Sequence, residues 1–163
     1  MTTRSDYTDD EWQLLHELPD AVATLVLMAG SSGPIGTIRE MEALGQANSR
    51  AASRFSGVPL IQALARSLPP VHAGPRKERQ GDTLDMCREA VALLDAKAAP
   101  EEASAYRKWI IAVAQEIAWA AKEGAFLGFG GERVSQWETE VMREVSSALG
   151  LPATPQTPQT PPA

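Results

Sequence analysis

Hydrophobic residues recur along this chain at the spacing of one helix face. One such set consists of Leu84, Cys87, Val91 and Leu94. These positions are i, i+3, i+7 and i+10, which fall on one side of a helix. A wider apolar stripe between residues 100 and 123 is typical of a central helix that packs on several neighbours. Its members are Tyr106, Ile110, Val113, Ile117 and Ala120, and Trp109 extends it. The pattern predicts an all-α protein.

Capping and turn signals divide this pattern into about seven helices. In a capping box, Ser or Thr and a Glu three residues later each bond the other's backbone N–H. The sequence holds three such pairs: Thr8 with Glu11, Thr37 with Glu40, and Ser135 with Glu138. Pro19 and Pro100 suit the first turn of a helix, where an N–H has no partner within the helix. The predicted helices are 8–18, 19–29, 37–55, 57–68, 83–98, 100–123 and 135–150.

The predicted domain organisation is one helical domain over residues 1–150. A chain of 163 residues is long enough for one such core. The proline- and glycine-rich connector from Pro69 to Asp82 is interpreted as a long loop within this domain, because neither flank can bury a core alone. The tail, residues 151–163, repeats Pro, Thr and Gln and is predicted to be disordered.

Two parts of the sequence share one plan, which indicates an internal repeat. In each, an apolar helix leads through a glycine-rich turn into a capped helix; the turns are Gly30–Gly36 and Gly124–Gly131. More than one register aligns the two parts, so the repeat has no unique alignment. We call each glycine-rich turn an elbow and expect a bundle with pseudo-two-fold symmetry. Each elbow would then join two antiparallel helices.

The second elbow resembles a known family. Residues Gly131–Glu138, GERVSQWE, are similar to the Gly-x-x-Val-Ser-x-x-Glu signature of the TerB-like superfamily, and the similarity covers residues 100–149. That superfamily includes tellurite-resistance proteins and a domain of some DnaJ-like co-chaperones. The resemblance implies an all-helical fold with two elbows, a stress-associated role, and metal binding by acidic residues at the elbow. In the family an aspartate usually precedes the elbow glycine, and here that position is Gly130.

The second elbow also holds the candidate binding residues. Phe126 and Phe129 are apolar side chains in a predicted loop, and they either fold back on the bundle or contact a partner or a second copy. Gly130 and Gly131 either form a tight turn or place backbone N–H groups around an anion. Glu132 and Trp137 complete the candidate binding set.

A metal site at the same elbow is the alternative that the resemblance favours. Glu132 and Glu138 are the candidate ligands, and Glu116 and Glu123 are further carboxylates that could converge there. A hard cation needs several oxygen ligands at one point. Glu138 already has a capping role, and Glu116 and Glu123 share a helix face that is more simply explained as solvated. No cofactor is expected from the sequence.

The remaining chemistry-bearing residues are few. Cys87 lies on an apolar stripe and is predicted to be buried and inert, so its pairing with His16 or His72 is a weak candidate for an active site. Arg50 and Arg54, four residues apart, are interpreted as a solvated face.

Charge and hydropathy exclude several partners. The net charge of −6 argues against nucleic acid as a partner, because the phosphate backbone is also negative. The apolar run Ala21–Gly30 is half the length of a membrane-spanning helix, and the N-terminal sequence has no apolar core of a signal peptide. A cytoplasmic protein is therefore expected.

Three classes of function follow from the sequence. The leading hypothesis is a small interaction or adaptor protein that binds a protein partner or forms a homodimer through the second elbow. The alternative is a metal- or small-anion-binding stress protein that uses the same elbow. An enzyme ranks last, because the sequence has no strong catalytic motif.

Overall fold

The computed structural model describes residues 1–30, 38–66, 76–125 and 136–152, and these residues form helices and short turns without a strand. A 3₁₀ turn, η1 (Arg4–Asp6), comes before six α-helices in these ranges. They are α1 (Asp9–Gly30), α2 (Ile38–Ser53), α3 (Pro59–Leu64), α4 (Arg76–Lys97), α5 (Pro100–Ala125) and α6 (Gln136–Ala148). The all-α prediction is confirmed, with six helices in the described part of the chain rather than about seven.

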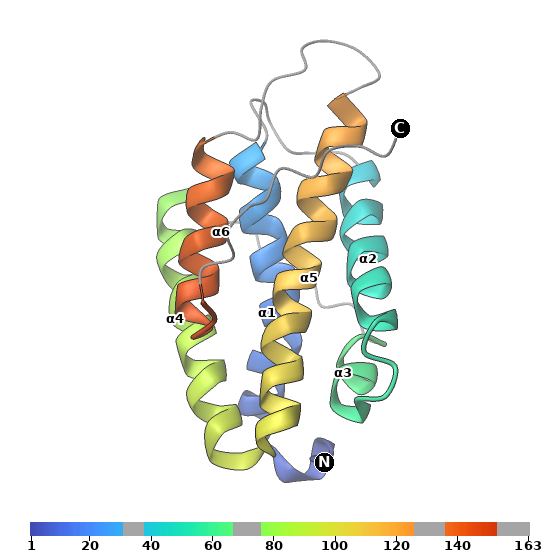
Figure 1. Cartoon of the computed structure of the whole chain (residues 1–163), viewed down its shortest axis with the longest axis vertical. Helices are drawn as coiled ribbons and strands as arrows, with labels where there is room; N and C mark the ends of the chain where they lie inside the picture. The colour runs from blue at the N-terminus through green and yellow to red at the C-terminus, as the bar shows by residue number, and fades with distance from the viewer. Residues whose placement is uncertain (31–37, 67–75, 126–135, 153–163) are drawn as a thin grey trace.

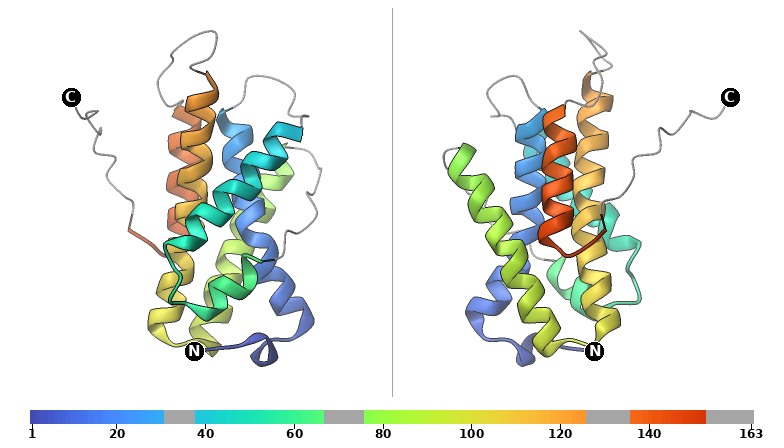
Figure 2. Two further views of the ribbon diagram at one scale, coloured as in Figure 1. Left: turned by 90° about the vertical axis from the view of Figure 1, so that its right-hand side faces the viewer. Right: turned by 60° about the vertical axis from the view of Figure 1, so that its left-hand side comes forward.

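The helices form one elongated bundle around α1 and α5 (Figure 1). These two helices run in the same direction and pack side by side, while α2, α4 and α6 run the opposite way (Figures 1 and 2). Helix α5 packs against all the other α-helices, as expected for the central helix. We call the end where α1 and α5 finish the elbow end, and the opposite end, where α4 meets α5, the N-terminal end (Figure 1).

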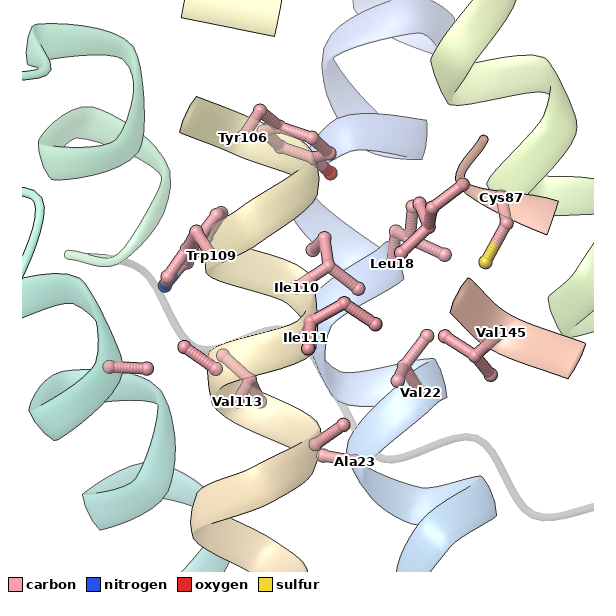
Figure 3. Close-up of a cluster of buried hydrophobic side chains, with 14 of the residues drawn as sticks. Leu18, Val22, Ala23, Cys87, Tyr106, Trp109, Ile110, Ile111, Val113 and Val145 are labelled. Carbon is pink, nitrogen blue, oxygen red and sulfur yellow. The ribbon is translucent and has the colours of Figure 1, made fainter. Parts of the chain in front are cut away.

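The core lies between α1 and α5 and continues on both sides of them. Toward α4 and α6, the side chains of Leu18, Val22, Cys87 and Val145 gather around Ile110 of α5 (Figure 3). Toward α2 and α3, the indole of Trp109 extends away from α1 (Figure 3) and is fully buried. The predicted stripe of α5 is therefore buried on more than one side, which a single amphipathic face would not achieve.

Helix α1 runs without interruption through Pro19, so the prediction of a new helix at Pro19 was wrong. Proline inside a helix leaves the carbonyl four residues earlier without its N–H donor, and here that carbonyl belongs to Leu15. The hydroxyl of Tyr106 donates a hydrogen bond to the Leu15 oxygen at 2.7 Å. Both residues are fully buried, and Figure 3 shows the Tyr106 hydroxyl directed toward α1. Helix α5 thus supplies the donor that Pro19 lacks.

Helix α4 begins at Arg76, seven residues before the predicted start at Thr83. The predicted connector was therefore too long at its C-terminal end. Residues 76–80 are Arg, Lys, Glu, Arg and Gln, which are all good helix formers, and Pro75 lies before the helix rather than inside it. Gly81 reduces helix stability without ending the helix, because one interior glycine costs only about 1 kcal/mol relative to alanine.

Local signals at two helix ends are confirmed. At the start of α1, the Thr8 N–H donates to Glu11 at 2.7 Å and the Glu11 N–H donates to the Thr8 hydroxyl at 3.3 Å. After α6, Gly150 adopts a φ of 67°, and the Gly150 and Leu151 N–H groups donate to the carbonyls of Ser147 and Ser146. This is a Schellman motif, which ends the helix where the sequence places glycine. The other two predicted capping boxes begin at Thr37 and Ser135, outside the described residues.

The internal repeat is matched only approximately. Helices α1 and α2 run antiparallel, as do α5 and α6 (Figure 1). However, α2 packs mainly on α5 and α6 packs mainly on α1, so each second helix contacts the other half more than its own. The first helices also exceed the expected lengths, with 22 residues in α1 and 26 in α5. The predicted tail and both glycine-rich turns lie largely outside the described residues.

Candidate functional site

Most of the predicted site falls in residues 126–135, which lie outside the described part of the chain. This range contains Phe126, Phe129, Gly130, Gly131 and Glu132. Trp137 and Glu138 lie in the first turn of α6, and for these two residues only the backbone is described. Their roles as binding residues or metal ligands therefore stay predictions. The elbow end itself is described through α1, α5 and α6, which carry the chain to and from this elbow (Figure 1).

Trp119 is the large aromatic side chain that the described residues present at the elbow end. It is 58% exposed, whereas Trp109, ten residues earlier on the same helix, is fully buried. Apart from Met1, it is the large hydrophobic residue that the described part of the chain leaves exposed. The structure therefore makes Trp109 a core residue and Trp119 a surface residue.

An ion pair between Arg54, which directly follows α2, and Glu116 of α5 lies one turn before Trp119. Arg54 donates from its Nη2 to Oε1 of Glu116. The Glu116 side chain is 15% exposed and that of Arg54 is 54% exposed, so the carboxylate is the more enclosed partner. The pair neutralises both charges beside Trp119. Because Arg54 is engaged by Glu116, it does not form a basic surface together with Arg50. Arg50 donates a hydrogen bond to the side chain of Gln46 at 3.4 Å.

The same ion pair bears on the predicted metal site. Of the four carboxylates considered for it, Glu116 is engaged by Arg54, and the side chains of the others are outside the described set. Among the described residues, no group of three or more His, Cys, Asp or Glu side chains is placed to hold a metal ion. Metal binding at the second elbow therefore depends on residues that the structure does not describe.

The candidate nucleophile Cys87 is buried, as predicted from its apolar stripe. Burial raises the pKa of the Cys87 thiol to about 12, against a smaller opposing effect of Arg88. The side chain is therefore a thiol at neutral pH, and a Cys–His nucleophile needs the thiolate. His72, one proposed base, lies outside the described residues.

The other histidine, His16, lies on α1 one turn before Asp20. Burial raises the pKa of Asp20 to about 6, and the neighbouring His16 acts in the opposite direction. One carboxylate oxygen of Asp20, Oδ1, is buried and has no hydrogen-bond partner in the described structure. A raised carboxyl pKa is typical of catalytic acids as well as of structural carboxylates.

The N-terminal end holds a polar cluster that the sequence did not indicate. We define this N-terminal cluster as Thr2, Tyr7, Glu11, Lys97 and Glu102. In its outer part, the Lys97 ammonium donates hydrogen bonds to the Glu11 carboxylate at 2.6 Å and to the Asp6 carbonyl at 3.2 Å. The Lys97 ammonium also lies 5.7 Å from the centre of the Tyr7 ring, and its hydrogen bond lowers the pKa of Glu11.

The inner part of the cluster is a chain of hydroxyl groups ending on a carboxylate. The Thr2 N–H and the Thr2 hydroxyl both donate to Oε2 of Glu102, at 2.8 and 2.9 Å. Tyr7 and Thr2 hydroxyls are 2.9 Å apart, and the Thr2 proton is already given to Glu102, so Tyr7 is the donor. In the sequence, Glu102 is one of two acidic residues that follow Pro100. Acidic residues are common in the first turn of a helix, so their presence did not indicate this cluster.

Comparisons with protein-family models, with curated proteins and with solved structures found no match to this chain. The resemblance to the TerB-like superfamily therefore stays a prediction from its elbow motif. Within the described residues, no helix has both the length and the apolar character needed to cross a membrane.

Proposed function

We propose that this protein is a small helical interaction domain that pairs with a second copy of itself through its elbow end. The observation that carries the proposal is the exposure of Trp119, 58%, on a helix whose other large apolar side chains are buried. Tryptophan is enriched among the residues that dominate the binding energy of protein interfaces. The predicted aromatic residues Phe126 and Phe129 follow α5 directly and would enlarge the same surface.

The charge around Trp119 favours a second copy as the partner. The chain carries a net charge of −6, so two copies repel each other over most of their surfaces. Beside Trp119, however, the negative charge of Glu116 is balanced by its ion pair with Arg54. Two copies can therefore approach here without an unpaired Glu116 carboxylate on either side. The same ion pair engages one of the carboxylates that the metal-binding alternative would use, which favours association over metal binding.

Size-exclusion chromatography with light scattering tests the proposal on the full chain at several concentrations. We expect a dimer for the wild type and a folded monomer for Trp119→Ser, because truncating a central interface tryptophan weakens binding by about 2 kcal/mol or more. Gln115→Ser is the matched control, because Gln115 is an exposed residue one turn earlier on α5. A wild type that is monomeric at every concentration, or a Trp119→Ser variant that remains a dimer, would contradict the proposal. Phe126→Ser with Phe129→Ser then tests whether the predicted elbow residues belong to the surface.

A further inference from the structure

The proline-rich segment that follows α6, residues 151–163, has a three-residue period that the proposed function leaves unexplained. Its sequence places proline at Pro152, Pro155, Pro158 and Pro161. A polyproline II helix has three residues per turn, so this spacing puts the four prolines along one face. The segment contains no charged side chain. It therefore presents an uncharged apolar ridge that loses little conformational entropy when it binds.

The surface that such a ridge binds is an exposed aromatic side chain. Proline-rich segments in the polyproline II conformation dock on grooves lined by aromatic residues. Trp119 is the large aromatic side chain that the described residues leave exposed, at 58%. The charge of Glu116, one turn earlier on α5, is balanced by Arg54. An uncharged segment that lies across Trp119 therefore does not cover an unpaired Glu116 carboxylate.

The proline-rich segment starts within reach of Trp119 on the same copy. Helix α6 runs opposite to α5 and ends beside Arg107, since a Cβ placed on Gly150 would lie 3.7 Å from Nη1 of Arg107 (Figure 1). Trp119 is twelve residues further along α5, which is about 18 Å at 1.5 Å per residue. A polyproline II helix advances about 3.1 Å per residue, so Pro155 and Pro158 come roughly 16 and 25 Å after Gly150. These two prolines bracket the distance to Trp119.

We propose that residues 152–161 dock as a polyproline II helix on Trp119 of their own copy and thereby compete with the second copy for this side chain. The regulatory part of this inference rests on the proposed function. Docking within one copy is favoured over exchange between copies by the short tether from Gly150. Such a tether holds the segment near Trp119 at an effective concentration on the order of 1 mM, which exceeds the concentration of segments from other copies in dilute solution.

Acrylamide quenching of tryptophan fluorescence tests the docking on the full chain, diluted until sedimentation finds a monomer. The contribution of Trp119 is the difference between each chain and its Trp119→Phe counterpart. If the segment covers Trp119 half of the time, quenching of Trp119 should rise about twofold in a proline variant that combines Pro155→Ala, Pro158→Ala and Pro161→Ala. A glutamine variant, Gln156→Ala with Gln159→Ala, is the matched control, because these residues lie on another face of the three-residue repeat. Unchanged quenching in the proline variant, or an equal rise in both variants, would overturn the proposal.

Sedimentation at a series of concentrations tests the competition with the second copy. With Trp119 covered half of the time, both copies are open together about a quarter of the time, so the proline variant should dimerise about fourfold more tightly than the wild type. The glutamine variant should dimerise like the wild type. A proline variant that dimerises equally or more weakly would overturn the competition and leave the proposed dimer intact. A chain that stays monomeric in every variant would instead overturn the proposed dimer, and the quenching comparison would still decide whether the segment binds Trp119.

Discussion

The contact between Tyr106 and α1 gives the most specific test of how this chain folds. Pro19 has no N–H, and the Leu15 carbonyl that would have accepted it is bonded by the Tyr106 hydroxyl at 2.7 Å. Burial raises the pKa of Tyr106 well above its ordinary value, so the hydroxyl keeps its proton and acts as a donor. We therefore predict that Tyr106→Phe destabilises the protein mainly because the Leu15 carbonyl loses this donor.

The size of the effect follows from burial. Leu15 and Tyr106 are both fully buried, so no solvent can replace the lost donor without a rearrangement. Leaving a buried acceptor unsatisfied costs about 1–3 kcal/mol. In a chain of 163 residues this corresponds to a fall in melting temperature of roughly 3–10 °C. The aromatic ring stays in place, so its edge-to-face contact with Trp109 at 5.5 Å should be retained.

A double-mutant cycle with Pro19→Ala separates this explanation from a general loss of packing. Alanine restores the N–H at position 19, which can donate to Leu15 within the helix. In the Pro19→Ala background, Tyr106→Phe should therefore cost at least 1 kcal/mol less than in the wild type, as measured by urea denaturation. Tyr7→Phe is the control, because the Tyr7 hydroxyl bonds Thr2 and not α1, and its effect should add to that of Pro19→Ala. If the two Tyr106→Phe effects agree within about 0.5 kcal/mol, the hydroxyl does not replace the missing N–H.

Three other substitutions have expected outcomes in denaturant unfolding. Gly81→Ala should raise the free energy of unfolding by about 0.5–1 kcal/mol, because Gly81 is inside α4 and an added Cβ meets no atom within 4 Å. A decrease would show that the helix does not include residue 81. Gly150→Ala should lower the free energy of unfolding by about 1 kcal/mol, because the φ of 67° after α6 strains any residue with a Cβ, and a neutral result would contradict that geometry. Asp20→Asn should be stabilising by about 1–2 kcal/mol at pH 7, after discounting for partial exposure, and much less so at pH 4. Burial raises the folded pKa of Asp20 from 3.8 to about 6, so the folded state binds more protons than the unfolded state and loses stability as the pH rises through this window. An equal effect at both pH values would refute this account.

The sequence predicted the fold class and the core because these depend on periodicity. The stripe of Tyr106, Ile110, Val113 and Ile117 is buried as expected, and so is Cys87 on its own stripe. Helix ends were predicted correctly where the signal is local. The capping pair of Thr8 with Glu11 and the glycine after α6 each act within one turn of the chain, so the sequence alone contains the whole interaction.

The candidate site was predictable only in part. The predicted aromatic residues of the elbow lie largely outside the described residues, and the sequence did not indicate which tryptophan of α5 would be exposed. Trp109 and Trp119 both lie on α5, yet Trp109 is fully buried and Trp119 is 58% exposed, a difference set by the tertiary packing around α5 and not by local sequence. The N-terminal cluster was missed for a related reason. Thr2 and Glu102 are separated by 100 positions, and neither has a neighbour in the sequence that suggests the pairing.

The wrong boundary at Pro19 and the missed N-terminal cluster have one physical cause, which is a hydrogen bond between residues far apart in the sequence. Local rules treat proline as a helix boundary because they assume that its orphaned carbonyl must face water or a turn. In this protein a hydroxyl 91 positions away bonds that carbonyl inside the core, so the apolar stripe of α1 continues through Pro19. A proline within an otherwise unbroken apolar stripe therefore has two readings, a boundary or an interior proline whose carbonyl is bonded from a facing helix. The second reading requires a buried donor on the central helix, and among the described residues of the α5 stripe Tyr106 is the side chain whose hydroxyl meets that requirement.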